Sequence, residues 1–169
     1  MGALGSWMTE LKKPGPREED VKTIDSIIFA LYDVISGPPG ERDWARDRHL
    51  FMPHARLIRT RKNPDGSTFV KVMTAEEFEA DAAPILNKGF YEIEIARTTE
   101  QFGNIAHTFS TYESRNTPDE APFARGINSI QLLHDGKRWW VTAIAWDIER
   151  AGNPLVARYL PEARKSRGQ

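Results

Sequence analysis

Residues 126–147, GINSIQLLHDGKRWWVTAIAWD, contain two apolar stretches joined by an Asp-Gly pair. An Asp-Gly pair in this setting is typical of a hairpin turn, so the segment predicts two long antiparallel strands. The second stretch is rich in tryptophan and the first contains polar side chains: Trp139, Trp140, Trp146, Asn128, Ser129 and Gln131. The two strands therefore form either a very full core or the wall of a cavity that holds a ligand.

Strict alternation gives the second of these strands two faces, and neither is typical of a surface in contact with water. One face would carry Trp140, Thr142, Ile144 and Trp146, and the other Trp139, Val141, Ala143, Ala145 and Asp147. A sheet with one wet face alternates more cleanly, so we expect both faces to be covered. Because three helices can cover only one face, we expect a second copy of the chain on the other.

The N-terminal half of the chain predicts three helices. Apolar residues recur at three- and four-residue steps over residues 17–35, which indicates an amphipathic helix that a Gly- and Pro-rich segment then ends. A shorter helix is expected over residues 42–51. Thr74 and Glu77 have the spacing of a capping box, so a third helix should begin there, and Pro84 should kink or end it.

Strands account for most of the remaining chain. We expect a short hairpin with a Pro-Asp-Gly turn and then a meander of four long strands, over residues 55–60, 67–73, 90–102, 104–115, 123–133 and 138–147. Helices that precede an antiparallel meander indicate an α+β fold.

The length and composition fit one soluble globular domain. With 169 residues, we expect a single domain over residues 18–150, preceded by a flexible arm (1–17) and followed by a C-terminal tail (151–169). A net charge of −1 gives no reason to expect nucleic acid or an anionic membrane as a partner. The sequence has no cysteine and no apolar run near the ~20 residues that cross a bilayer, so we expect a cytoplasmic protein.

No signature of a cofactor or metal site is present. The sequence lacks the glycine-rich phosphate loops and the nucleophile elbow, and its four histidines do not have metal-ligand spacing. We therefore expect no cofactor and no metal. The basic C-terminal end, which includes Arg164, Lys165 and Arg167, is expected to be solvated.

Three segments resemble the nuclear transport factor 2-like superfamily, including its SnoaL-like branch, also described as a cystatin-like α+β cone. They are RDWARDRHLFMPHARLI (42–58), MTAEEFEAD (73–81) and FARGINSIQLLHDGKRWWVTAIAWD (123–147), and the resemblance extends over residues 18–150. It implies a curved, mixed but mainly antiparallel sheet wrapped by three N-terminal helices. It also implies a pocket inside this cone and a homodimer formed through the outer face of the sheet.

The resemblance does not decide the function. The superfamily includes ketosteroid isomerases, dehydratases, polyketide cyclases, transport adaptors and small-ligand binders, so function must be derived from the site. Where the isomerases resemble this chain, the position of their carboxylate base is Arg59. A cation cannot abstract a proton, so isomerase chemistry of that kind is not expected.

His54, His107 and Tyr112 are the candidate catalytic residues. Histidine titrates near neutral pH, so two histidines that converge in the cone with a tyrosine would form an acid–base site. The alternatives are that His54 caps local backbone at a strand entrance and that His107 is a core or interface residue.

Five further residues are candidates for ligand binding. Asn128 could orient a polar group of a ligand, Arg56 lies one same-side step from His54, and Trp44, Trp140 and Trp146 could wall a pocket. The same polar residues could instead form a cross-strand or dimer seam, and the tryptophans could equally fill the core.

Together these patterns predict a homodimeric, cone-shaped protein that binds a small, largely apolar molecule. One alternative is a dehydratase-, cyclase- or isomerase-type enzyme that uses a pocket histidine and tyrosine. Another is a non-catalytic dimerisation or assembly module whose cone is filled by its own side chains. The volume of the cavity separates this last alternative from the other two.

Overall fold

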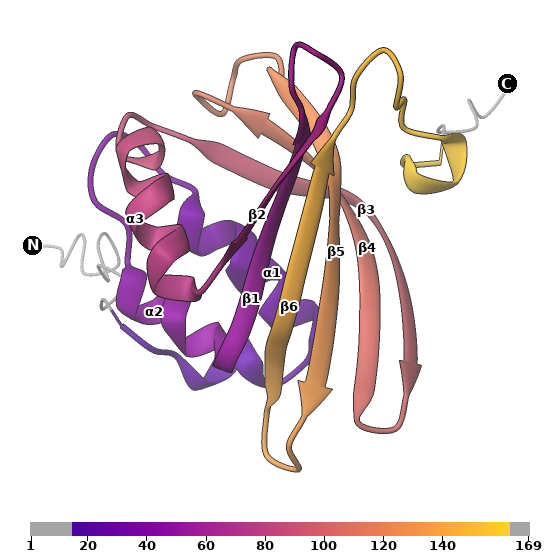
Figure 1. Ribbon diagram of the computed structural model, residues 1–169. Helices are drawn as coiled ribbons and strands as arrows, with labels where there is room; N and C mark the ends of the chain where they lie inside the picture. Colours follow the sequence, from indigo (N-terminus) through magenta and orange to yellow (C-terminus); the bar gives the residue numbers. More distant parts are fainter. Residues whose placement is uncertain (1–14, 163–169) are drawn as a thin grey trace, which may run out of the picture.

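The computed structural model describes residues 15–162, in which three helices pack on one side of a six-stranded sheet (Figure 1). In chain order the elements are η1 (Glu18–Val21), α1 (Ile24–Ile35), α2 (Trp44–Leu50), β1 (Phe51–Lys62), β2 (Thr68–Met73), α3 (Ala75–Leu86), β3 (Tyr91–Phe102), β4 (Ile105–Arg115), β5 (Ala124–His134), β6 (Trp139–Ile148) and η2 (Ala157–Tyr159). Most of the expected N-terminal arm and the basic C-terminal end lie outside the described residues.

The sheet has the order β2-β1-β6-β5-β4-β3. Strands β3 to β6 form the predicted antiparallel meander, β1 and β2 form the predicted hairpin, and β1 pairs in parallel with β6. The sheet curves around the helices (Figure 1), so the predicted α+β class with a mixed, mainly antiparallel sheet is confirmed. No helix within residues 15–162 is long and apolar enough to span a membrane.

Two helix starts follow from local capping. The predicted capping box of Thr74 and Glu77 opens α3, and a second box, formed by Thr23 and Ser26, opens α1. Because Thr23 caps α1, the α-helix begins at residue 24 and not at 17, and the preceding residues form the short turn η1. Pro84 does not end α3, which continues to Leu86.

Arg42 joins the ends of two helices. Its buried guanidinium donates hydrogen bonds to the carbonyl oxygens of Ile35 (2.9 Å) and Gly37 (2.9 Å) at the end of α1 and to that of Leu86 (2.5 Å) at the end of α3. Two more carbonyls in the connecting loop accept from the same group. Carbonyls at a helix end have no partner within the helix, so Arg42 satisfies them and fixes α1 and α3 beside each other.

A β-bulge in β6 changes the expected faces of that strand. Gln131 pairs with Ala143 but Leu132 pairs with Val141, so Thr142 is an extra residue and the alternation shifts there. Trp139, Val141, Ile144 and Trp146 consequently all lie on the inner face. The prediction that Trp139 and Trp146 lie on opposite faces is therefore wrong. Ile130 and Leu132 of β5 also lie on the inner face.

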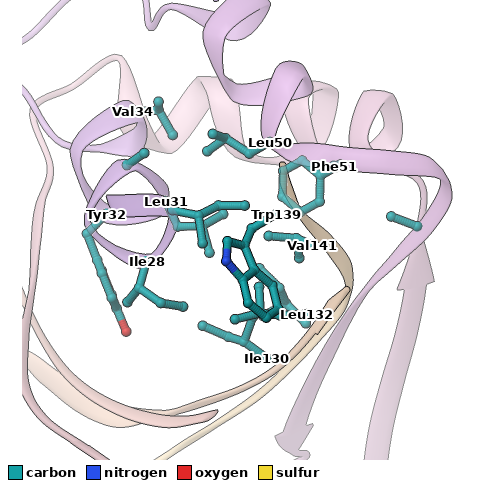
Figure 2. Packing of buried hydrophobic residues seen from close by; sticks show 14 of the residues in the cluster. Ile28, Leu31, Tyr32, Val34, Leu50, Phe51, Ile130, Leu132, Trp139 and Val141 are labelled. Carbon is teal, nitrogen blue, oxygen red and sulfur yellow. The ribbon is translucent and has the colours of Figure 1, made fainter. Parts of the chain in front are cut away.

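The core fills the closed end of the cone. Figure 2 shows Ile28 and Leu31 of α1 packed with Ile130 and Val141 of the sheet, with the Trp139 indole among them. Two neighbouring cross-strand rows of the inner face are almost wholly apolar: Phe51, Val141, Leu132 and Ala106, then Met73, Leu57, Ile144, Ile130 and Thr108. The next row contains Arg59, Trp146, Asn128 and Ser110. The inner face therefore changes from apolar to polar along the strands.

The outer face of the sheet is only partly covered. One row across it carries no charge and consists of Val72, Ile58, Ala145, Ser129 and Phe109. The C-terminal segment crosses one side of this face, where the Tyr159 ring lies 5.5 Å from that of Phe109 and the Thr111 hydroxyl donates to the Tyr159 carbonyl (2.6 Å). Between segment and sheet lies an open groove of about 520 Å³.

Candidate functional site

A cavity of about 290 Å³ lies between the helices and the inner face of the sheet. Its walls are mainly apolar and include Leu31 of α1, Phe78 of α3, and Ile130, Ile144 and Trp146 of the sheet. Phe78 meets Trp146 edge to face, with ring centroids 6.0 Å apart. The cavity therefore has a firm aromatic and aliphatic wall on both the helical and the strand side.

A directed chain of hydrogen bonds runs along the polar row of the inner face. The Asn128 amide donates to the Tyr32 hydroxyl (3.1 Å), which lies 2.6 Å from the Ser110 hydroxyl, and Ser110 donates to the Glu94 carboxylate. Since Ser110 has one proton, Tyr32 must be the donor to it. Burial raises the pKa of Tyr32 above its usual value, so Tyr32 stays neutral.

Glu92 can change its protonation state near neutral pH. Its carboxyl lines the cavity and accepts a hydrogen bond from Ser114 (2.9 Å). The desolvating surroundings raise the pKa of Glu92 to about 7, although the hydrogen bonds from Ser114 and Asn128 oppose this shift. A carboxyl group with a pKa in this range is a candidate general acid or base.

The Tyr112 side chain is affected by the charge of Glu92 and packs against Gly126. Burial and the Glu92 charge both raise the pKa of Tyr112 above its usual value, so its hydroxyl stays protonated. Gly126 is its cross-strand partner, and a Cβ at Gly126 would lie only 2.5 Å from the Tyr112 hydroxyl. The glycine is therefore what makes room for the Tyr112 side chain.

Asp47 of α2 also lines the cavity and is only 2% exposed. Its Oδ2 atom has no hydrogen-bond partner within residues 15–162. Burial raises the pKa of Asp47 to about 7, the nearby Glu79 adds to this shift, and Arg48 opposes it.

Arg59 is the one cationic residue among those lining the cavity within the described chain. Its guanidinium lies 3.0 Å from Asp81, which also accepts a hydrogen bond from Lys71 (2.6 Å). Arg59 is the cross-strand neighbour of Trp146. Arg59, which stands at the position of the carboxylate base in the isomerases, therefore already pairs with Asp81.

Three of the eight residues predicted for the site line this cavity, namely Tyr112, Asn128 and Trp146. Trp44, His54, Arg56, His107 and Trp140 are not among the lining residues. The two histidines do not converge. His54 is exposed in an irregular part of β1 with a positive φ of 68°, and His107 lies exposed on the outer face with its Nε2 atom 3.0 Å from Glu100.

The other three residues have evident structural contacts. Trp44 is buried between α2 and α3 against Ala82 and Leu86. Trp140 donates from its indole to Asp135 (2.8 Å), and the Arg138 guanidinium lies 3.5 Å from the centroid of its ring. Arg56 donates to the His54 carbonyl (2.6 Å) on the exposed side of β1.

Sequence reasoning missed Tyr32, Asp47 and Glu92. A signal was present for two of them: Tyr32 belongs to the inward positions of the first amphipathic helix, and Asp47 stands three residues from both Trp44 and Leu50 on the short helix. Glu92 gave no such signal, because it alternates with apolar residues and shares its predicted strand face with Glu94. An acid on the buried side of an element is uncommon enough to mark a site.

Comparison with known proteins is informative at the level of the fold. No protein-family model matches the sequence, and no curated protein is significantly similar to it. A protein of unknown function with a cystatin-like fold, from Nostoc punctiforme, superimposes with a TM-score of 0.54 at 13% identity over 77% of this chain and 96% of its own. A candidate ketosteroid isomerase from Parabacteroides distasonis superimposes with a TM-score of 0.53 at 9% identity over 80% of this chain and 98% of its own.

The chain has the nuclear transport factor 2-like fold. Identities this low establish the fold and leave the reaction and ligand open. No set of three or more His, Asp or Glu side chains within the described part of the chain is arranged to hold a metal ion. Two carboxyl groups with raised pKa values, Asp47 and Glu92, and two neutral tyrosines, Tyr32 and Tyr112, line the cavity.

Proposed function

We propose that this protein binds a small, largely apolar molecule in the cavity between α1, α3 and the inner face of the sheet. The cavity volume of about 290 Å³ is the observation that carries the proposal. It is close to the lower end of the ~300–1,000 Å³ typical of ligand sites. A cone filled by its own side chains would leave much less space, which argues against a purely structural assembly module.

The residues that line the cavity indicate an apolar ligand with a few polar groups. Ile130, Ile144 and Trp146 offer an apolar surface, and Tyr112 and Asn128 bring polar groups to the same side. Apolar walls with a few convergent polar groups are the usual composition of a small-molecule site.

Filling the cavity should abolish binding. Ala82 of α3 lines the cavity and is buried, whereas Ala80 on the same helix is exposed. Native mass spectrometry of the purified protein should detect a small molecule bound to each subunit. Ala82→Phe should lose it and Ala80→Phe should keep it. If neither the natural protein nor Ala80→Phe carries or accepts a small molecule, the proposal is wrong.

Acid–base catalysis is a second candidate, because Glu92 has a pKa of about 7 at the cavity wall. The histidines lie elsewhere, so Glu92 is the acid–base group of this candidate and Tyr112 the neutral hydrogen-bond donor. An acid and a donor of this kind suit proton removal next to a carbonyl group.

Hydrogen–deuterium exchange tests this second candidate without knowledge of the substrate. Cyclohexanone in deuterated buffer should exchange its α-protons faster with the natural protein than with Glu92→Gln, as followed by NMR. Equal rates for both proteins, or a rate no higher than that of buffer, would exclude Glu92 as a base for such ketones.

We also infer that two copies associate through the outer face of the sheet. The uncharged row that contains Phe109, Ala145 and Val72 supports this inference, since Phe109 is 37% exposed and Val72 is 56% exposed. Contiguous apolar surface of this kind commonly marks a protein interface.

A further inference from the structure

The unpaired carboxyl group of Asp47 is costly in its present surroundings. Its side chain is 2% exposed, and its Oδ2 atom has no partner within the described chain. A buried polar atom without a hydrogen bond is rare in folded proteins and destabilises the fold, so it calls for an explanation. Asp47 lines the cavity, so a bound molecule can approach its carboxyl group.

The charges around the cavity favour a donor and disfavour an anion. Three acids line it, namely Asp47 from α2, Asp81 from α3 and Glu92 from β3, against the single described cation Arg59 from β1. Asp81 already neutralises Arg59 at 3.0 Å. An anionic ligand would therefore meet the carboxyl groups of Asp47 and Glu92, and the only nearby cation, Arg59, already pairs with Asp81 although its Nε atom has no hydrogen-bond partner within the described chain.

No side chain within the described chain forms a hydrogen bond to the Oδ2 atom of Asp47. Leu31, Phe51 and Phe78 line the same cavity and have no polar side-chain atom to offer. The charged groups that act on Asp47 are Glu79, which disfavours its ionised form, and Arg48, which favours it. Neither forms a hydrogen bond to its Oδ2 atom.

We propose that Asp47 recognises a hydrogen-bond donor on an otherwise apolar ligand, and that the preferred donor is a protonated amine. This inference rests on the proposed binding function and adds the ligand class to it. A carboxylate–ammonium pair would place opposite charges together in a poorly solvated site, where such bonds are strongest.

Binding of an amine should then depend on pH. An alkylammonium stays charged across neutral pH, whereas Asp47 is ionised only above its pKa of about 7. Glu92 at the cavity wall titrates in the same range, while the hydrogen bond from Lys71 holds the pKa of Asp81 below its usual value, so Asp81 stays ionised. Affinity for the amine should rise from about pH 6 to about pH 8, and the part of this rise due to Asp47 should be lost when Asp47 is neutral.

Three cage compounds with one apolar body separate the possibilities: adamantylamine, adamantanol and adamantane carboxylate. Calorimetric titration of the natural protein should rank the amine first and the carboxylate last. Asp47→Asn should weaken amine binding about tenfold or more and reduce its pH dependence, while adamantanol binding changes less. Asp47→Leu serves as a second variant without hydrogen-bonding atoms, and Asp119→Asn, on an exposed loop, is the matched control.

The outcomes distinguish this inference from the function on which it rests. If no cage compound binds, the binding function itself fails. If the compounds bind but the carboxylate equals or exceeds the amine, or if the preference for the amine survives in both Asp47 variants, the cavity binds ligands and the role of Asp47 is wrong.

Discussion

Two carboxyl groups, Asp47 and Glu92, determine the electrostatic character of the cavity. Both line it, and burial raises the pKa of each to about 7. In the unfolded chain both would titrate near pH 4. The folded protein therefore keeps two protons that the unfolded chain releases between about pH 4 and about pH 7, so these groups lower the free energy of unfolding as the pH rises through that window.

Replacement of Asp47 and Glu92 by neutral side chains should remove this pH-dependent loss of stability. The double variant Asp47→Asn/Glu92→Gln should gain stability over the natural protein as the pH rises from about 4 to about 7, by on the order of 3 kcal/mol for each group. Above about pH 7 the difference should be constant. Urea unfolding at a series of pH values measures it, with Asp119→Asn as control. A difference that is flat across the window would mean that the two groups are ordinary acids in the folded protein.

Gly126 is a position where a single methyl group has a large effect. An added Cβ would lie 2.3 Å from the Asp147 carbonyl oxygen, which belongs to the backbone, and 2.5 Å from the Tyr112 hydroxyl. We expect Gly126→Ala to lower the free energy of unfolding by about 2 kcal/mol and to displace Tyr112 from the cavity wall. Gly152→Ala, whose Cβ would meet no atom within 4 Å, should be almost neutral in the same denaturation experiment. Equal effects of the two substitutions would contradict this role of Gly126.

Among the elements, the helices depend on one arginine for their arrangement. Arg42 binds carbonyl oxygens at the ends of α1 and α3, and the other side of α3 lines the cavity. The bond to Leu86 spans 44 residues of sequence and leaves no local pattern, which is why the sequence did not reveal the link between the two helices. The capping box of Thr74 and Glu77 is local and was predicted correctly.

Loss of the Arg42 guanidinium should loosen both helices. Arg42→Met should lower the free energy of unfolding by about 3 kcal/mol, because the carbonyls of Ile35, Pro38 and Gly40 lose their side-chain donor at once and that of Leu86 keeps only a backbone donor. Arg42→Lys should recover only part of it, since an ammonium cannot reach the same set of acceptors. Lys88→Met, at an exposed position close to the end of α3, is the control and should change little in thermal denaturation. A stability unchanged in Arg42→Met would show that packing alone holds the two helices.

The β-bulge in β6 explains how much of the site the sequence could predict. The strands and their order follow from alternation and turn residues, so the α+β fold could be predicted. One extra residue, Thr142, exchanges the faces on either side of it, and no residue type announces a bulge there. Trp146 was placed in the site and does line the cavity, whereas Trp140 lies on the other face.

At the scale of the whole molecule, we assign ligand binding to the inner face of the sheet and association of two copies to the outer face. The inner face and helices enclose the cavity, and the outer face exposes an uncharged row around Phe109. Whether the two histidines converge could not be predicted, because their positions depend on a positive φ at His54 and on the register of β4, neither of which sequence spacing shows.

Introduction of a single charged side chain on the outer face should prevent two copies from associating there. The natural protein should sediment as a dimer at micromolar concentration, and Phe109→Lys should sediment as a monomer, because a buried unpaired ammonium opposes the interface. Phe29→Lys on α1, where the phenylalanine is 65% exposed on the helical side, should remain dimeric. A natural protein that is monomeric at this concentration would remove the dimer from the account.

The most direct measurement of the central claim is the location of a bound ligand by NMR. With adamantanol bound, intermolecular nuclear Overhauser effects should connect the cage protons to the methyl groups of Ile130 and Ile144 and to the indole of Trp146, which line the cavity. Contacts that instead involve Phe109 and Ala145, in the groove on the outer face, would place the ligand on the wrong side of the sheet and contradict the account.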